Sequence, residues 1–348
     1  MTATATIYLN ACSHGLPDRA CAEAIARQAR NSLGRRDEEV TLRENARRAC
    51  AAFLNSAAPS LAMGNGTFQL RASAMDRLPP RSGRILVAEH EWGDNVRWLR
   101  RLSAKSGMTI DVIRGKRGAP PDVSAWAARM DEDVRALCLP LVTSIDGLCY
   151  PAQEIASIAR PKDALVVLDV AQALGRVSIV PDDMNCDVVV GTARKWLRAP
   201  RQTAMMWLST RAERMLGCDA RTLEPFDLNL ALLAGLSRAL ELSSDVITIA
   251  DRVSQLDNQL RDGLNGAKMI KLSSVGYVGT VTCLVRAAAK PVLEKKLRAE
   301  GIIVKWCDAE WDEPLANHGK SSERLRMSPH IYNSPADIES AVNAICTA

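Results

Sequence analysis

The sequence predicts an α/β protein with a mainly parallel sheet. Between residues 85 and 190, short apolar and β-branched runs alternate with helical patterns, and this alternation is typical of strands joined by helical crossovers. Several of these runs are apolar at every position, as expected for strands that are buried on both faces. The 348 residues suffice for a large domain and a smaller one. We place a large domain at residues 1–242, with an N-terminal arm at 1–20, and a small α+β domain at 243–348.

Composition limits the classes of function. Hydrophobic residues make up 47% of the chain and charged residues 24%, which are ordinary values for a globular protein. The net charge of +5 is spread along the chain, so no nucleic-acid partner is expected, and no apolar run approaches the roughly 20 residues that cross a bilayer. The four histidines are too scattered to predict a metal site. The ten cysteines form no CxxC pair and no signal peptide precedes Ile7, which favours free thiols in a reducing cytoplasm.

Local patterns justify the elements in order. Pro17 can start the first helix, and a helical recurrence of apolar residues from Val40 to Phe53 indicates the second. A glycine-containing turn at 62–67 precedes the third helix. Helices are expected at 20–29, 38–54, 68–74, 123–130 and 151–159, and strands at 7–9, 85–88, 108–113, 134–141, 165–168 and 188–190. Two long helices follow at 229–242 and 246–264, and the segments 278–285, 291–300, 301–304 and 336–345 make up the small domain.

The segment from Leu165 to Thr203 carries the strongest functional signal. Asp169 ends one buried strand, Gln172 follows three residues later, and a second apolar run leads to Lys195. Ligands of open α/β sheets bind at the carboxyl ends of the strands, so the acid and the amine can meet across one small ligand. This pair suits pyridoxal 5′-phosphate (PLP), because a lysine forms a Schiff base with its aldehyde while a carboxylate keeps its pyridine nitrogen protonated. Taken singly, either residue is more often structural.

The segments LDVAQALGRV and VVVGTARKWLRAPRQT resemble the core of the class V aminotransferases. This family includes cysteine desulfurases, isopenicillin N epimerase-like enzymes and the C–S lyases of ergothioneine biosynthesis. The resemblance implies fold-type I, in which a large domain with a mainly parallel, seven-stranded-type sheet carries a smaller α+β C-terminal domain. It also implies that Asp169 pairs with the pyridine nitrogen, Gln172 bonds the ring hydroxyl, Thr192 touches the phosphate and Lys195 binds the aldehyde.

Further cofactor contacts follow from the resemblance at matching positions. Gly66 and Thr67 match the turn that cradles the phosphate, where free amides at a helix start favour an anion. Trp92 matches the residue that stacks on the ring, with His90 as the alternative, although a tryptophan after a strand is often only packing. Thr143 matches the loop on the cofactor side, where a structural role in the turn is equally ordinary.

The substrate side of the predicted site comes from both ends of the chain. His14 lies in an N-terminal loop that contacts substrate in the resembled family, and Arg326 matches the arginine that holds the α-carboxylate. After Lys195 the family usually has glycines at three positions where this chain has other residues: Ala199, Gln202 and Ala204. In relatives this loop reaches the phosphate of the partner subunit, so Arg201 or Thr203 is expected to make that contact in a homodimer.

The reaction predicted from these residues is a C–S β-lyase reaction on an amino acid or a cysteine S-conjugate. An aminotransferase or a cysteine desulfurase-like enzyme stays open as an alternative, because all three share the first steps. A desulfurase needs a mobile cysteine in the small domain, and Cys307 is instead expected to be structural. The missing glycines also leave open a catalytically degenerate scaffold of the same fold.

Overall fold

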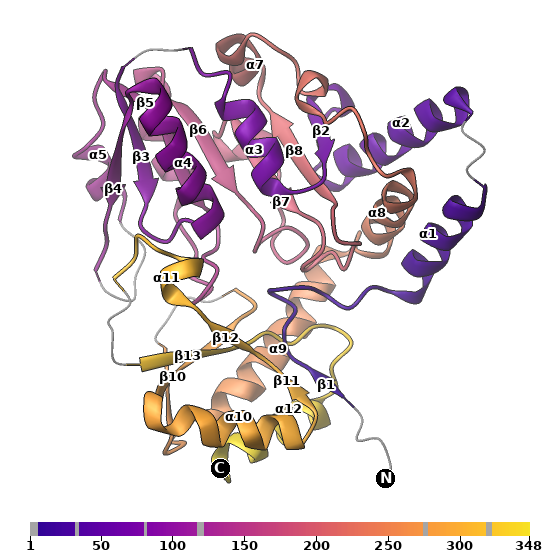
Figure 1. Cartoon of the computed structure of the whole chain (residues 1–348), viewed down its shortest axis with the longest axis vertical. Coiled ribbons are helices and arrows are strands. Elements are labelled where there is room, and N and C mark those ends of the chain that lie inside the picture. Colours follow the sequence, from indigo (N-terminus) through magenta and orange to yellow (C-terminus); the bar gives the residue numbers. More distant parts are fainter. Residues whose placement is uncertain (1–5, 32–34, 80–81, 117–121, 274–277, 318–321) are drawn as a thin grey trace.

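Two sheets organise the chain (Figure 1). The computed structural model describes residues 6–31, 35–79, 82–116, 122–273, 278–317 and 322–348. A seven-stranded sheet lies in the upper half of the view in Figure 1, and a four-stranded sheet lies below it in the described part of the chain.

The large sheet is mainly parallel, as predicted. Its order is β2-β8-β7-β6-β5-β3-β4, and β8 runs antiparallel to both of its neighbours while the other neighbouring pairs are parallel. The strands are β2 (Leu61–Gly64), β3 (Arg84–Ala88), β4 (Thr109–Ile113), β5 (Val134–Pro140), β6 (Leu165–Asp169), β7 (Val188–Thr192) and β8 (Ala204–Leu208). Strand β4 lies on one side of β3, and β5, the next strand in the sequence, lies on the other side. The direction in which successive strands are added therefore reverses between β3 and β5. A change of this kind marks the crevice where such sheets bind ligands.

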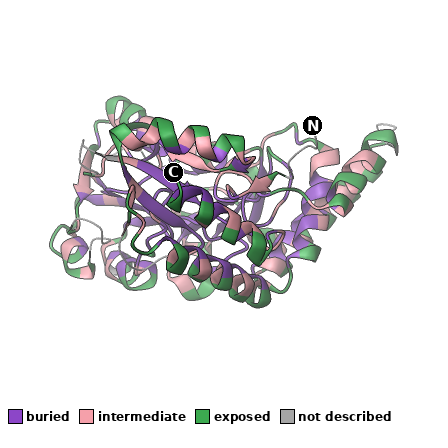
Figure 2. Ribbon diagram, turned by 90° about the horizontal axis from the view of Figure 1, so that it is seen from below, coloured by how far each residue is buried: buried purple, intermediate pink, exposed green. Residues whose placement is uncertain are grey.

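Helices cover both faces of this sheet. They are α1 (Arg19–Asn31), α2 (Arg36–Phe53), α3 (Thr67–Met75), α4 (Gly93–Ser106), α5 (Val123–Ala127), α6 (Ala152–Ala159), α7 (Thr210–Leu216) and α8 (Leu230–Leu242). Successive residues of β6 alternate between two cores: Val166 and Leu168 pack on the side of α2, α6 and α8, whereas Leu165 and Val167 pack on the side of α3, α4 and α7. The strands are therefore buried on both faces, which Figure 2 shows as a buried sheet between partly exposed helices.

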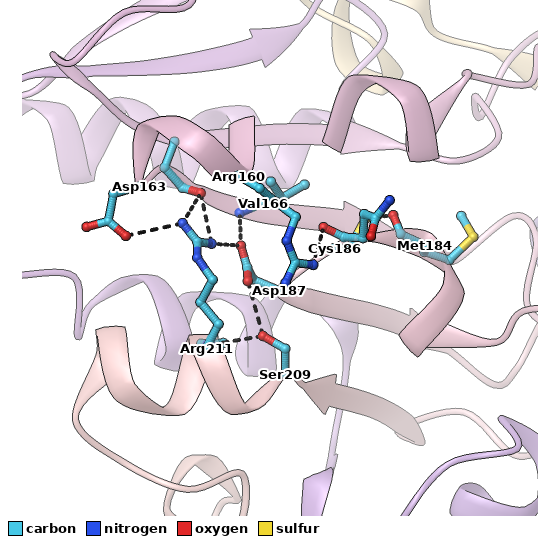
Figure 3. A network of polar contacts seen from close by, with 11 residues as sticks. Arg160, Asp163, Val166, Met184, Cys186, Asp187, Ser209 and Arg211 are labelled. Carbon is cyan, nitrogen blue, oxygen red and sulfur yellow. Dashed lines mark hydrogen bonds and ion pairs between the residues drawn. The ribbon is translucent and has the colours of Figure 1, made fainter. Parts of the chain in front are cut away.

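A buried carboxylate ties the amino ends of the central strands together (Figure 3). Asp187, which is fully buried just before β7, accepts hydrogen bonds from the backbone N–H of Val166 at 2.9 Å and from Ser209 Oγ at 3.1 Å. Arg211 forms an ion pair with the same carboxylate. The network fixes β6 and β7 at the end opposite to Asp169 and Lys195, so it acts on their register and not on the chemistry.

The second sheet forms a separate core. Its strands are β9 (Ile270–Leu272), β10 (Val281–Arg286), β12 (Lys305–Cys307) and β13 (Ser322–Met327), in the antiparallel order β12-β13-β10-β9. Helices α9 (Val246–Leu264), α10 (Lys290–Ala299) and α12 (Pro335–Cys346) pack around it, and the short α11 (Ala309–Asp312) approaches α4. The ion pair between Arg176 and Asp257, 3.7 Å apart, connects α9 to the loop after β6. The division at 242/243 stays a prediction.

The N-terminal arm is attached to the C-terminal part of the chain, where it forms a two-stranded sheet with β11. Strand β1 (Ile7–Tyr8) pairs in parallel with β11 (Ile302–Ile303), and Leu9 lies in the same core as α9 and α12. The backbone N–H of Gly15 then donates to the Arg194 carbonyl at 2.9 Å. A Cβ on Gly15 would lie 2.2 Å from the backbone oxygen of Lys195, so only glycine allows this close approach.

The described ranges contain neither a helix that could span a membrane nor a cluster of metal ligands. None of the helices there combines the length and the apolar character that crossing a bilayer requires. No cluster of three or more potential metal ligands occurs in the same ranges. All ten cysteines are free thiols.

Candidate active site

A cavity of about 350 Å³ opens at the carboxyl edge of the large sheet. It is bounded by the segments that follow β3, β5, β6 and β7, by the N-terminal arm, and by β12 and β13 of the second sheet. Eight of the predicted site residues line it: Gly66, Thr67, Trp92, Asp169, Gln172, Thr192, Lys195 and Arg326. Residues far apart in the sequence therefore converge on the crevice that the sheet topology creates.

Asp169 is held firmly at the end of β6. It lies between Pro140 of β5 and Val190 of β7 in the register of the sheet. Its Oδ1 accepts the backbone N–H of Ala171 at 2.8 Å, and its Oδ2 accepts Asn95 Nδ2 at 3.0 Å. Burial, and next the Glu91 carboxylate, raise the Asp169 pKa, while Arg71 and Lys195 oppose this shift. The carboxyl group is thus a buried acceptor that gains from a cationic partner in the cavity.

Lys195 enters the cavity from the turn after β7. Its side chain is buried, and its Nζ lies 6.0 Å from the centre of the Trp92 ring. Burial, followed by the charge of Arg194, lowers the Lys195 pKa to about 7, although Asp169 acts in the opposite direction. A lysine with such a pKa is substantially neutral near neutral pH and can act as a nucleophile or as a base.

The loop after Lys195 holds two residues in a backbone conformation that is typical of glycine. Arg198 has a φ of 57° and Gln202 a φ of 62°, both in the left-handed region that favours glycine. The loop is closed by Ala193 N–H donating to the Thr203 carbonyl at 3.0 Å. The chain keeps the turn without the glycine at position 202 and accepts a modest backbone strain.

Gln172 presents a buried, unused acceptor to the cavity. Its Nε2 donates to the Cys12 carbonyl at 3.1 Å, but its Oε1 is buried and has no hydrogen-bond partner. A buried polar atom without a partner costs free energy, so a donor on a bound molecule would stabilise this arrangement. The position agrees with a contact to a ring hydroxyl.

The start of α3 forms the other end of the cavity. Gly66 precedes the helix with extended backbone, a Cβ there would meet open space, and Thr67 Oγ1 is buried without a partner. Thr192 lines the same cavity and donates its hydroxyl to the Thr203 carbonyl at 3.2 Å. Free amides and a free hydroxyl at a helix start suit a phosphate.

Arg326 reaches the cavity from β13. It is 2% exposed, one of its terminal nitrogens donates to Ser13 Oγ at 2.8 Å, and the other donates to the Ser144 carbonyl. Its Nε is buried without a partner, and among the described residues no carboxylate forms an ion pair with it. A guanidinium in this state is suited to a carboxylate of a ligand.

Three predicted site residues lie outside the lining of the cavity. Thr143 accepts the Leu148 N–H at 3.0 Å within a turn, and Thr203 donates to the Pro200 carbonyl at 2.6 Å. His14 is half-buried, and burial, then Arg201, lower its pKa. Its Nδ1 is buried without a partner. In this geometry the two threonines support loops, and the roles predicted for all three residues stay predictions.

Sequence reasoning missed the polar residues that support Asp169. Asn95 is 1% exposed, and it joins Asp169 to Glu91, which pairs with Arg71 at 3.1 Å. The sequence offered one signal, a charged residue among the buried positions Leu70, Ala74 and Met75 of α3. That signal does not reveal its partner, because Arg71 and Glu91 meet only through the fold.

The sequence is similar to known proteins of one family. The sequence model of the family described as Aminotransferase class-V matches residues 22–340. The isopenicillin N epimerase of Amycolatopsis lactamdurans is 30% identical over 208 residues, which cover 56% of this chain and 52% of that protein. The chain therefore spans about half the length of this curated relative.

Solved structures share the fold over almost the whole chain. The apo cysteine desulfurase from Thermococcus onnurineus NA1 superposes with a TM-score of 0.88 at 16% identity, covering 98% of this chain and 94% of that one. The cystine C–S lyase C-DES, in complex with its product cysteine persulfide, gives a TM-score of 0.87 at 17% identity and covers 98% and 97%. These likenesses establish the α/β fold with its mainly parallel sheet.

Proposed function

The chain belongs to the class V aminotransferase family, and on that premise we propose that it is a PLP-dependent C–S β-lyase acting on an amino acid or a cysteine S-conjugate. The observation that carries this proposal is that Asp169, Lys195 and Arg326 line one cavity. A carboxylate, an amine of lowered pKa and an unpaired guanidinium are the groups that PLP chemistry on an amino acid requires.

The residues present fit the cofactor. Asp169 would hold its pyridine nitrogen, Gln172 its ring hydroxyl, and Thr67 with Thr192 its phosphate. Two of these residues, Gln172 and Thr67, carry buried oxygens without a protein partner, at the places where a hydroxyl and a phosphate would supply one. Trp92 borders the same space and offers a ring face for stacking.

The residues of the chain divide the chemistry among themselves. Bound PLP supplies an electron sink for the electron pair left on Cα when its proton is removed. Arg326 binds the α-carboxylate and thereby fixes the orientation of the Cα–H bond. The Lys195 amine, with its pKa near 7, accepts the Cα proton at Nζ. Asp169 keeps a proton at the pyridine nitrogen, and the sulfur substituent then leaves from Cβ with the electron pair of the C–S bond.

The cysteines favour a lyase over a desulfurase. Cys307 lies in β12, where it is buried, and burial raises its pKa to about 12. Cys12 is the cysteine among the described lining residues, and its sulfur lies 2.7 Å from Thr280 Oγ1, which engages it within the wall. Neither thiol has the mobile, accessible placement that sulfur transfer from a substrate requires.

The proposal includes a homodimer in a reducing cytoplasm. The loop that holds Arg201 and Thr203 would approach the phosphate of the partner subunit, and the 98% exposed Phe226 favours burial against another surface. The ten free cysteines are compatible with a reducing compartment. Light scattering of the purified protein measures the subunit number, and a monomer at working concentration would contradict the dimer.

Pyruvate release tests the reaction. The wild-type protein, supplied with PLP and a cysteine S-conjugate but no keto acid, should release pyruvate, while the Lys195→Ala variant should release none. Product formation only when a keto acid is added would make the enzyme an aminotransferase. A wild-type protein that stays colourless with PLP would instead support the degenerate scaffold.

A further inference from the structure

A network of three buried polar side chains lies between Asp169 and the interior of the large domain. Arg71 comes from α3, Glu91 from the turn after β3, and Asn95 from the first turn of α4. Their exposed fractions are 1%, 0% and 1%, so none of them exchanges its partners for water.

Both N–H groups of the Asn95 side-chain amide donate hydrogen bonds within this network. Nδ2 donates to Glu91 Oε1 at 2.8 Å and to Asp169 Oδ2 at 3.0 Å. Glu91 Oε1 also accepts the backbone N–H of Trp92 at 3.0 Å. Together with the Ala171 N–H on Oδ1, the amide of Asn95 fixes the plane of the Asp169 carboxyl group.

The network and Asp169 together carry one negative charge in excess. Arg71 pairs with Glu91 at 3.1 Å, and Asp169 adds a second carboxylate that no arginine or lysine contacts as an ion pair among the described residues. Arg71 and Glu91 both act on the Asp169 pKa, with opposite signs, because all three side chains are buried close together. Glu91 therefore offsets the positive charge that Arg71 would otherwise exert on Asp169.

We infer that Arg71, Glu91 and Asn95 are positioning residues that keep Asp169 oriented toward a protonated ring nitrogen and keep the net charge of the site negative. The inference rests on the proposed function, since the ring nitrogen belongs to PLP. Asn95 supplies the orientation, and the Arg71–Glu91 pair supplies a balanced charge. Without Glu91, the positive charge of Arg71 is no longer offset, and the ring nitrogen loses its proton more easily.

Glu91→Gln separates charge from geometry. The amide keeps an oxygen for the N–H groups of Asn95 and Trp92 but removes the negative charge. The readout is the ¹⁵N NMR shift of PLP labelled at the ring nitrogen, followed from pH 6 to pH 9. We expect the ring-nitrogen pKa to fall by about one unit or more, a tenfold change in the ratio of protonated to unprotonated ring nitrogen. The double variant Arg71→Gln/Glu91→Gln removes one charge of each sign and should restore the wild-type shift.

A purely structural role predicts the opposite order, because the double variant then loses more contacts than the single one. Glu224→Gln is the matched control. Glu224 pairs with the buried Arg47 at 2.6 Å and accepts the Met63 N–H at 2.7 Å, but it does not line the cavity. This control should lower the thermal midpoint and leave the ¹⁵N shift unchanged. An unchanged shift in Glu91→Gln, or no recovery in the double variant, overturns the inference.

Asn95→Leu gives a second measurement if Glu91→Gln does not fold. It removes the N–H that Asp169 accepts and leaves Arg71 and Glu91 in place. We expect the dissociation constant for PLP, measured by equilibrium dialysis, to rise about tenfold, which corresponds to the loss of one charge-assisted hydrogen bond. Unchanged affinity refutes the positioning role of Asn95. If the wild-type protein itself binds no labelled PLP, the proposed function fails, and this result differs from every result above.

Discussion

Replacing Lys195 by methionine should stabilise the cofactor-free protein. Burial lowers the pKa of this lysine from 10.5 to about 7, so the unfolded chain binds the proton more tightly than the folded one does. The resulting penalty is absent above about pH 10.5, grows as the pH falls and is complete below about pH 7. At pH 7 the shift corresponds to a destabilisation on the order of 4 kcal/mol, which methionine removes while it keeps the apolar stem.

Urea unfolding of the apoprotein at pH 7 and near pH 10 measures this difference. Lys195→Met should exceed the wild-type protein in its free energy of unfolding at pH 7, and the gap should narrow strongly toward pH 10. Replacement of the exposed Lys271 by methionine is the control and should change little at either pH. Equal stability of Lys195→Met and wild type at pH 7, or a gap that does not depend on pH, would refute the reasoning.

Four other outcomes are expected. Asp257→Asn should reduce the pH dependence of the free energy of unfolding. Burial raises the Asp257 pKa to about 7, so the wild-type protein loses stability as the pH rises from about 4 to 7. Urea titrations at pH 5 and pH 7 should show a smaller loss in the variant. Asp187→Ala should cost about 3 kcal/mol in chemical unfolding, because it strands the donors of Figure 3, and a cost under about 1 kcal/mol would contradict that view. Trp92→Ala should weaken PLP binding roughly threefold to tenfold by loss of ring stacking, whereas a larger effect of His90→Ala in the same titration would make histidine the stacking residue. Gly15→Ala should displace the backbone at Lys195 and slow the capture of PLP by the apoprotein, and an unchanged rate would show that the loop yields without consequence.

Much of the large domain could be predicted because its signals are local. The run from Leu165 to Leu168 is apolar at every position and predicts a strand that ends at Asp169, and the structure has β6 at Leu165–Asp169. Strand β8 at 204–208 was not foreseen, since a short apolar run after an irregular loop does not reveal which neighbour it joins. The attachment of the N-terminal arm to β11 was also missed, because pairing over such a sequence separation leaves no periodic trace.

The candidate site was predictable where motif and chemistry coincide. Asp169, Gln172 and Lys195 meet in one cavity as the spacing and the resemblance implied. Thr143 closes a turn, and its role toward the cofactor stays a prediction, because a hydroxyl beside a strand end readily takes a backbone partner. The role of Asn95 could not be predicted from the sequence, because its amide acts by donating to the carboxylates of Glu91 and Asp169, and only the fold brings Asp169 close to it.

The attachment of the arm has a consequence for how the site opens and closes. Ser328 N–H donates to the Leu9 carbonyl at 2.9 Å, Ala11 N–H donates to the Ser328 carbonyl at 3.1 Å, and Arg326 donates to Ser13 Oγ. Residues 9–13 and Arg326, which we propose to bind the carboxylate, thus belong to a single mechanical unit, although more than 300 positions separate Ser13 from Arg326. A tilt of the second sheet would move the N-terminal arm and Arg326 together. A movement that displaces Arg326 to admit a substrate would therefore also move the arm away from Lys195.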